Sequence, residues 1–375
     1  MWSLIREKAF GSKHMVIKAL ELSSYRNYDR MCLTLHEGTN IFYGDNAQGK
    51  TNILEAIYVC GTTKSHRGSK DKEVIQFEKE ESHLKMILNR KGLDYRIDMH
   101  LKKNKPKGIA INGVPIRKAS ELLGIAHVIF FSPEDLGIIK NGPSERRHFI
   151  DMELCQLNPV YTSQLSSYNK VVLQRNKLLK DLSYKPETMD TLQIWDMQMV
   201  RYGTSIIRER RRFIDRLNEI ITEVHDRLTE GKERLLIRYE PNVTEEAFES
   251  ALETGRDRDL RQKSTLNGPH RDDICFLVNG MDIRKFGSQG QQRTAALSLK
   301  LSEIRLVEEV AKDEPVLLLD DVLSELDSKR QNQLLSSISH IQTLITCTGL
   351  DDFVNGRFQM DKIFQVEHGT VACKN

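Results

Sequence analysis

The chain has 375 residues, a formal net charge of +3 at pH 7 and six cysteines. A nearly neutral chain has no bulk charge to attract nucleic acid, so a DNA-binding surface would have to come from local basic clusters. The cysteines are scattered without a C-x-x-C pair or a metal-ligand spacing, which predicts a reducing, cytoplasmic location. No stretch approaches the ~20 apolar residues of a membrane span, so we expect no membrane partner.

The length predicts about two domains, each with its own core. Residues 1–14 lack the apolar core of a signal peptide and end in a Gly-Ser-Lys-His sequence, so we interpret them as a leader introduced during cloning. An α/β lobe is expected to begin at residue 15 and to run to 143. Residues 16–43 alternate like antiparallel strands, and further strands are expected within 84–111 and at 128–131.

A phosphate-binding loop is predicted at 44–51, between a short strand at 40–43 and an apolar-periodic helix that continues from 52. The segment fits G-x-x-x-x-G-K-[ST], in which backbone N–H groups and a helix N-terminus face a polyphosphate. Lys50 would reach the β- and γ-phosphates of ATP, and the Thr51 hydroxyl would bind Mg²⁺. The candidate nucleotide contacts are Gly44, Asp45, Asn46, Ala47, Gln48, Gly49, Lys50 and Thr51.

The middle of the chain, 144–275, is predicted to be an inserted, mainly helical lobe. Apolar residues at steps of three and four mark two helices, with a break at Lys185-Pro186-Glu187. Two such helices would form a short antiparallel hairpin. The last part, 276–375, returns to strands and helices and is expected to complete the α/β lobe.

Two segments of this last part bear on chemistry. A strand at 316–319 delivers Asp320 and Asp321. Together with a phosphate loop, Asp320 is expected to anchor Mg²⁺ and Asp321 to orient the attacking water, so Asp321, Lys50 and Asp320 are the catalytic candidates.

The second segment is a polar turn at 286–293, followed by a helix over 294–310. The Ser288 hydroxyl and the Gly290 N–H at its start could hold a phosphate, with Gln291 beside them. The alternative is that Ser288 only caps the helix.

These motifs occur in the order of a known family. The 286–293 turn resembles the signature motif of ATP-binding-cassette ATPases, and Ser324-Glu325-Leu326-Asp327 resembles their D-loop. The combination, with Ser65-His66-Arg67 and the 267–273 segment, resembles the SMC-related branch and within it the bacterial RecF family. The resemblance implies an α/β ATPase head of the ABC/SMC type with a P-loop.

The resemblance also implies a function. The signature turn of one subunit would meet the γ-phosphate held by the other, so ATP would drive a homodimer that grips DNA. Such a clamp binds duplex and gapped DNA without sequence preference and acts with RecO and RecR to promote RecA loading. It would be a weak ATPase located in the cytoplasm at the nucleoid.

Two features qualify the hydrolytic roles. Asp321 stands where the general pattern more often has Glu. The histidine that ends the general pattern is missing, and if any residue replaces it, that residue is Thr346 or Thr348. We therefore expect slow turnover. Arg67 could contact the γ-phosphate as a finger, or could be an ordinary surface arginine.

Two basic clusters could hold DNA phosphates or could be solvated surface. They are a hairpin tip with Lys102, Lys103, Lys105 and Lys107, and a helix segment with Arg208, Arg210, Arg211, Arg212 and Arg216. Two other functions remain open from the residues: the ATP-hydrolysing subunit of a membrane transporter, and a nucleotide kinase.

Overall fold

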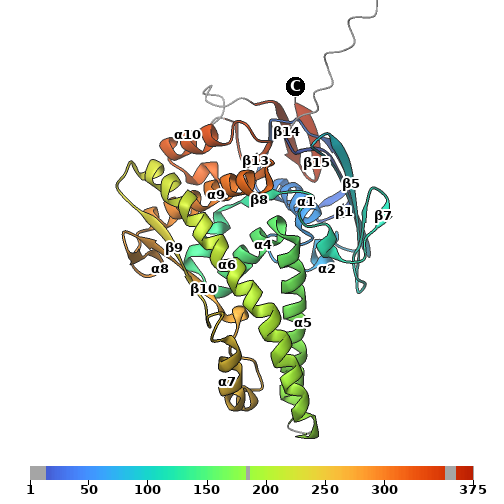
Figure 1. The fold of residues 1–375 in the computed structure, drawn as a ribbon. Coiled ribbons are helices and arrows are strands. Elements are labelled where there is room, and N and C mark those ends of the chain that lie inside the picture. Colours follow the sequence, from blue (N-terminus) through green and yellow to red (C-terminus); the bar gives the residue numbers. More distant parts are fainter. Residues whose placement is uncertain (1–13, 183–185, 351–359, 375) are drawn as a thin grey trace, which may run out of the picture. The chain divides into compact units, whose positions relative to one another are not determined.

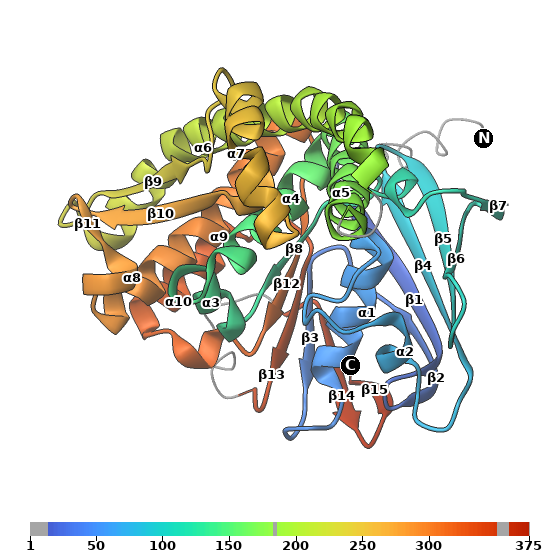
Figure 2. The ribbon, with the colours of Figure 1, turned by 90° about the horizontal axis from the view of Figure 1, so that it is seen from below.

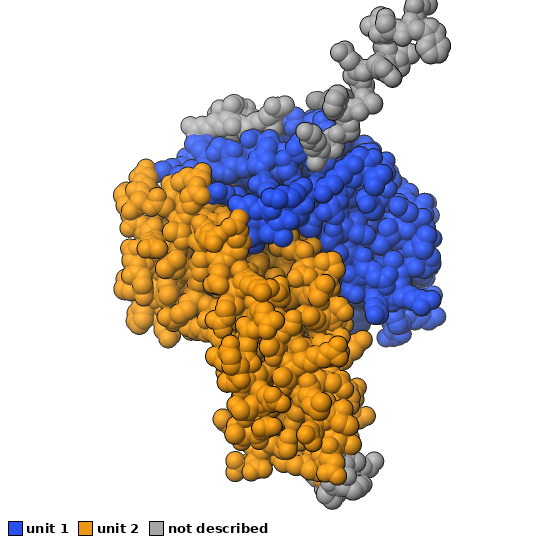
Figure 3. All heavy atoms as spheres, in the orientation of Figure 1, with its two compact units in different colours: residues 1–135, 303–375 blue, residues 136–302 orange. Residues whose placement is uncertain are grey.

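The computed structural model describes residues 14–182, 186–350 and 360–374. The leader expected at 1–14 lies outside the described residues except for His14. The described chain forms two compact units, which Figure 3 colours separately: 1–135 with 303–375, and 136–302. Helix α9 (Gln289–Ala311) contributes to both units.

The first unit contains a six-stranded sheet in the order β15-β14-β3-β13-β12-β8. All neighbours are parallel except the β14–β15 pair. The strands are short and mostly buried, as expected where both faces of a parallel sheet are covered. Their bounds are β3 (Thr39–Tyr43), β8 (Val128–Phe131), β12 (Val316–Asp320), β13 (Thr343–Cys347), β14 (Lys362–Glu367) and β15 (Thr370–Lys374).

A second, antiparallel sheet of this unit has the order β2-β1-β4-β5-β6-β7. Buried and exposed side chains alternate along most of its strands, which indicates one covered and one solvated face. Helix α1 (Lys50–Thr62) contacts strands of both sheets, as Figure 2 shows. The strands are β1 (Val16–Tyr25), β2 (Tyr28–Thr34), β4 (Glu81–Arg90), β5 (Leu93–Lys102), β6 (Gly108–Ile111) and β7 (Val114–Pro115).

Strand β3 does not join the antiparallel strands that the sequence predicts over 16–43. It pairs in parallel with β13 and β14 instead. The physical reason lies in its side chains: the first four of its five residues are buried, so both of its faces need cover. Two further helices complete this unit, α2 (Asp71–Val74) and α10 (Ser328–Ser337).

The second unit is built on a helical hairpin of α5 (Pro159–Asp181) and α6 (Leu192–Thr229), which Figure 1 shows side by side. The inward stripe of α6 is the predicted one, with Met199, Ile206, Ile214, Leu217 and Ile221 buried. The remaining helices are α3 (Leu136–Lys140), α4 (Pro143–Leu157), α7 (Phe248–Gln262) and α8 (Ile283–Phe286).

An antiparallel sheet also belongs to the second unit, in the order β11-β10-β9, and α6 packs on β9. Its strands are β9 (Leu235–Glu240), β10 (Asp273–Val278) and β11 (Met281–Asp282). The unit boundaries at 136 and 302 therefore differ from the insertion predicted at 144–275. The predicted boundary at 275 falls inside β10, which pairs with β9 along its whole length. Helix α8 contacts β10, and α3 contacts α8.

Candidate functional site

The predicted phosphate loop at 44–51 connects the end of β3 to the start of α1, as the strand–loop–helix pattern predicts. Gly44 has φ 152° and Gly49 has φ 111°, conformations that glycine adopts readily. A Cβ on Gly44 would lie 2.2 Å from the Val366 carbonyl oxygen, and one on Gly49 would lie 2.4 Å from the Asn27 amide nitrogen. Packing against a backbone carbonyl therefore requires glycine at 44. At Gly49 the near atoms belong to side chains, and the positive φ is what favours glycine.

The Lys50 side chain turns back into this loop. Its ammonium donates hydrogen bonds to the carbonyl oxygens of Gly44, at 2.6 Å, and Asp45, at 2.9 Å. The residue is 4 % exposed although it is charged. A lysine that two backbone carbonyl oxygens hold in the loop is suited to meet an anion that enters it.

Asp320, at the end of β12, is the electrostatic centre of the site. Its Oδ1 accepts hydrogen bonds from the Thr51 hydroxyl at 2.8 Å and from the Thr346 hydroxyl at 2.7 Å. Burial raises the pKa of Asp320, while the two hydroxyl hydrogen bonds act in the opposite direction. A hydroxyl and a carboxylate side by side are the oxygen ligands that Mg²⁺ prefers, so this donor set fits the ion.

Thr346 also organises the neighbouring residue. Its hydroxyl oxygen accepts a hydrogen bond from the Asp321 N–H at 3.0 Å, and the Asp321 carbonyl accepts one from Ser324 at 2.8 Å. The backbone of Asp321 lies in the left-handed region, with φ 51°. Of the two threonines considered at the end of β13, Thr346 is thus the one that contacts the carboxylate pair.

A second hydrogen-bonded set holds the loop from outside and was missed from the sequence. The Asn27 side chain donates to the Gln48 carbonyl at 2.9 Å, and the Tyr28 hydroxyl donates to the Gly49 carbonyl at 3.0 Å. The His368 N–H donates to the Gln48 side chain at 2.7 Å. In the sequence Asn27 is an ordinary hairpin-turn residue, and nothing there places it beside a loop twenty residues later.

Glu55 forms a buried network beneath α1. Its carboxylate accepts hydrogen bonds from Arg26, at 2.6 and 2.8 Å, from Ser65 at 2.5 Å and from Tyr25 at 3.1 Å. Burial alone would raise the Glu55 pKa, but the hydrogen bonds from Arg26 and Ser65 outweigh it and leave the pKa lowered. This carboxylate therefore stays charged and fixes the chain that follows α1.

That following chain carries Arg67. The Ser65 hydroxyl accepts a hydrogen bond from the Arg67 N–H at 3.2 Å, and the Arg67 side chain is exposed. Its charge lowers the pKa of Asp320, so the guanidinium lies within electrostatic reach of the Mg²⁺-type donor set. The adjacent His66 stacks on Phe130 at 3.7 Å, and burial lowers the pKa of His66 to about 4, so its ring is neutral near pH 7.

The signature turn belongs to the second unit, at the N-terminus of α9. Ser288 and Gln291 form a reciprocal cap: the Gln291 N–H donates to the Ser288 hydroxyl at 3.2 Å, and the Ser288 N–H donates to the Gln291 side chain at 3.0 Å. Ser288 and Gly290 are exposed. Ser288 therefore caps the helix, and its hydroxyl keeps a proton that can be donated to another group.

The arginine cluster on α6 differs from a free basic surface. Arg210 is buried and binds Asp151 at 2.8 Å and Asp272 at 2.9 Å. The exposed members of the cluster also have acidic neighbours: Arg208 and Arg211 with Glu245, Arg212 with Glu209, and Arg216 with Glu219. This segment is a network of ion pairs around one core arginine.

Comparison with known proteins agrees with the geometry. The family model described as RecF/RecN/SMC N terminal domain matches residues 16–372. The chain is 60 % identical to the DNA replication and repair protein RecF of Lachnoclostridium phytofermentans, over 95 % of this chain and 99 % of that protein. The chain belongs to the RecF family. The RecF of Clostridium botulinum, strain Alaska E43, is 44 % identical over 96 % of this chain and all of its own length.

The solved structures support the same family. A recombination mediator protein, RecF with ATP, of the RecFOR pathway superimposes with a TM-score of 0.92 at 35 % identity, covering 98 % of this chain and 100 % of the other. An Smc head domain from Pyrococcus furiosus matches with a TM-score of 0.55 at 15 % identity, covering 96 % of each chain, which shows a shared fold. The RecF fold is thus an α/β ATPase head of the SMC type. None of the helices in the described ranges is long and apolar enough to cross a membrane.

Proposed function

We propose that the chain is an ATP-dependent DNA clamp that works in recombinational repair and replication restart. The observation that carries this proposal is the convergence on Asp320 of the Thr51 hydroxyl, from the phosphate loop, and the Thr346 hydroxyl. The relative solved with ATP, at 35 % identity over nearly the whole chain, supports ATP as the ligand of this loop.

In this proposal the loop residues 44–51 hold the phosphates, with Lys50 donating to the β- and γ-phosphate oxygens. Thr51 and Asp320 would hold Mg²⁺, which would neutralise developing charge on the phosphates. Asp321 would orient the attacking water, and its backbone is held for that role by Thr346 and Ser324. Arg67 would approach the γ-phosphate from the segment fixed by Glu55.

The signature turn would complete the site of a second copy. Ser288, Gly290 and Gln291 stand at the exposed N-terminus of a helix of 23 residues, where the helix dipole favours an anion. ATP would then be sandwiched between two chains and would drive homodimerisation. Hydrolysis would be slow and would reopen the dimer.

The closed dimer would bind duplex and gapped DNA through phosphates, without sequence preference. Family membership supports the partners RecO and RecR and a role in RecA loading at single-strand gaps, in the cytoplasm at the nucleoid. Membership over residues 16–372 favours neither the transporter subunit nor the nucleotide kinase.

The test is ATP-dependent dimerisation by analytical ultracentrifugation, with and without gapped DNA, for the wild type and for Ser288→Arg. We expect the wild type to dimerise with ATP and Ser288→Arg to stay monomeric with its ATP affinity unchanged. Ser250→Arg is the matched control, since Ser250 is an exposed serine of α7 in the same unit. A monomeric Asp321→Asn variant in saturating ATP would show that the sandwich model is wrong.

A further inference from the structure

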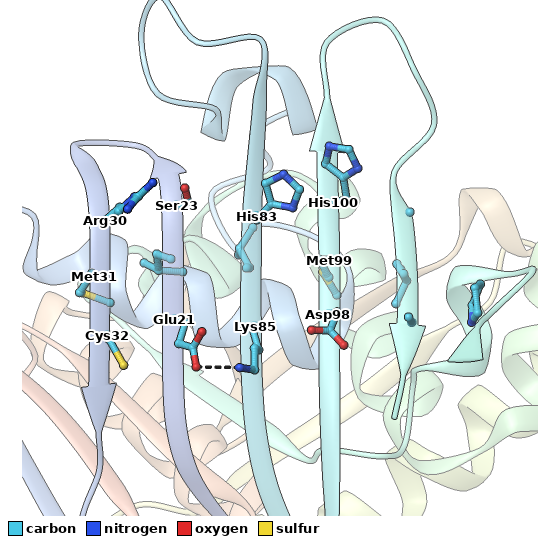
Figure 4. A pocket seen from close by; sticks show the side chains of 16 residues that line it. Glu21, Ser23, Arg30, Met31, Cys32, His83, Lys85, Asp98, Met99 and His100 are labelled. Carbon is cyan, nitrogen blue, oxygen red and sulfur yellow. Dashed lines mark hydrogen bonds and ion pairs between the residues drawn. The ribbon is translucent and has the colours of Figure 1, made fainter. Parts of the chain in front are cut away.

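The outer face of the antiparallel sheet carries a cluster of Glu81, His83 and His100. His83 on β4 stands directly opposite His100 on β5 in the strand register. Their rings are stacked, with centroids 4.2 Å apart and planes inclined by 12° (Figure 4). Glu81 lies diagonally across from His100, and its Oε2 is 3.1 Å from the His100 Nε2.

The pleat of β4 explains why these side chains meet. Residues two apart along a strand share a face, so Glu81 and His83 point the same way. Ser82 and Leu84, which alternate with them, are buried on the opposite face of the sheet. The three potential ligand atoms of Glu81, His83 and His100 lie within 4.8 Å of one another.

We propose that Glu81, His83 and His100 bind one transition-metal ion of the Zn²⁺, Co²⁺ or Ni²⁺ type. Two imidazoles with one carboxylate select borderline metals over Mg²⁺ and Ca²⁺, which prefer all-oxygen sites. Tetrahedral bonds of ~2.0 Å place ligand atoms about 3.3 Å apart. In the structure the ligand atoms lie within 4.8 Å of one another, and because His83 and His100 are exposed or half-exposed, their rings have room to rotate towards a shared ion.

The present contacts of Glu81 do not oppose the ion strongly. The Lys102 ammonium is 3.3 Å from the same Oε2, and both side chains are more than two fifths exposed. Exposed pairs of this kind contribute about 0–1 kcal/mol, so a metal ion displaces the lysine at little cost.

The surroundings favour a site with an open coordination position. His83 and His100 border a cavity of about 840 Å³ on this face, which also reaches Ser23, Arg30 and Asp98 (Figure 4). Three protein ligands leave a fourth position for water or for an anionic group that enters the cavity. Among the residues that the structure describes, this is the one group of three such side chains within reach of a single ion.

None of the three proposed ligands belongs to the phosphate loop at 44–51, so metal binding at the cluster and ATP binding are measured separately. Co²⁺ is titrated into the full chain in excess Mg²⁺, which fills oxygen-ligand sites, and the visible d–d absorption is recorded. Zn²⁺ affinity is then measured by competition. The variants are His100→Asn and Glu81→Gln, both at exposed or half-exposed positions. The matched control is His340→Asn, since His340 is an exposed histidine 2.7 Å from Glu308 that belongs to no such group of three among the described residues.

We expect one Co²⁺ per chain with the intense absorption of four- or five-coordinate cobalt, displaced by Zn²⁺. Each of the two cluster variants should weaken Zn²⁺ binding at least about tenfold, which corresponds to ~1.4 kcal/mol. His340→Asn should bind as the wild type does, and all the proteins should bind ATP equally. The proposal fails if the cluster variants keep the wild-type affinity, if His340→Asn loses as much, or if the cobalt spectrum is the weak one of a six-coordinate aqua ion.

Discussion

Replacing Thr346 by valine tests whether one hydroxyl organises the carboxylate pair. Valine has the shape of threonine but loses the hydrogen bond to Asp320 Oδ1 and the acceptor for the Asp321 N–H. A hydrogen bond to a charged group contributes ~1.5–3 kcal/mol, and an unsatisfied buried N–H costs ~1–3 kcal/mol. Burial of the added methyl returns about 0.8 kcal/mol. We therefore expect the free energy of unfolding of the nucleotide-free chain to fall by about 3 kcal/mol.

Urea unfolding, monitored by circular dichroism, measures this loss of free energy. Hydrogen exchange in β12 and β13 is measured as well, because a chain with two units need not unfold in one step. With a slope of ~3 kcal/mol per molar urea, the midpoint should fall by about 1 M. Thr346→Ser is the control, since it keeps the hydroxyl and loses only a methyl. The reasoning is refuted if Thr346→Val unfolds within about 0.5 kcal/mol of the wild type, or if serine costs as much as valine.

The pH dependence of the same variant follows from Asp320. Burial raises the pKa of Asp320, and the hydrogen bond from Thr346 counteracts that rise. The pKa of Asp320 should therefore be higher in Thr346→Val than in the wild type. A carboxyl whose pKa is higher in the folded chain binds more protons there, so stability falls as pH rises through the folded pKa. The deficit of Thr346→Val should thus be largest near neutral pH and shrink on acidification towards the ordinary range of aspartate.

Three further changes test other parts of the site. Gly44→Ala should lower the free energy of unfolding in urea by about 3 kcal/mol, because the new Cβ would lie 2.2 Å from a β14 carbonyl oxygen. The control is Gly68→Ala, which should cost about 1 kcal/mol, because Gly68 has φ 70° but nothing lies within 4 Å of the new Cβ. Equal losses would contradict this. Asp320→Asn should stabilise the nucleotide-free chain near neutral pH, since it removes a carboxylate with a raised pKa. It should also abolish the rise in melting temperature that Mg²⁺ and ATP cause. If Mg²⁺ and ATP still raise the melting temperature of the variant, the role assigned to Asp320 is wrong. Glu55→Gln should cost about 3 kcal/mol near pH 7, because it leaves the Arg26 charge without its buried partner. Since the Glu55 pKa is lowered in the folded chain, its contribution is lost as pH falls through that pKa, so wild type and variant should converge in acid; a constant gap would refute the assignment.

The parts of the site that could be predicted from the sequence are those fixed by local backbone geometry. A phosphate loop needs glycines, a lysine and a hydroxyl at set spacings between a strand and a helix, and the chain from β3 to α1 has that form. The hairpin of α5 and α6 was predictable for a similar reason, since its apolar stripe repeats at the helical period.

The rest depends on which segments meet in space. Asn27 contacts the phosphate loop because the β1–β2 turn reaches it, and no periodicity records that approach. The His83–His100 pair depends on the register of β4 against β5, and a shift of one residue would place one ring on the buried face. The sequence indicates a basic patch on α6, because it does not show that acidic residues of other elements, such as Asp151 and Asp272, pair with its arginines.

The backbone of residue 321 gives a structural reason why aspartate stands there, where the general pattern more often has glutamate. Asp321 has φ 51°, and short polar residues such as aspartate occupy the left-handed region more readily than longer side chains. Thr346 holds its N–H and Ser324 holds its carbonyl, so both backbone groups of Asp321 are fixed while Asp320 is fixed by its side chain. Under the proposed function this arrangement would separate two tasks. The buried Asp320 carboxylate, which accepts hydrogen bonds from two hydroxyls, would hold the metal ion, and the Asp321 carboxylate would meet the water. If Asp321 orients the attacking water as proposed, a short side chain on a fixed backbone gives it little freedom to reach that water, and the slow turnover expected from the sequence would follow.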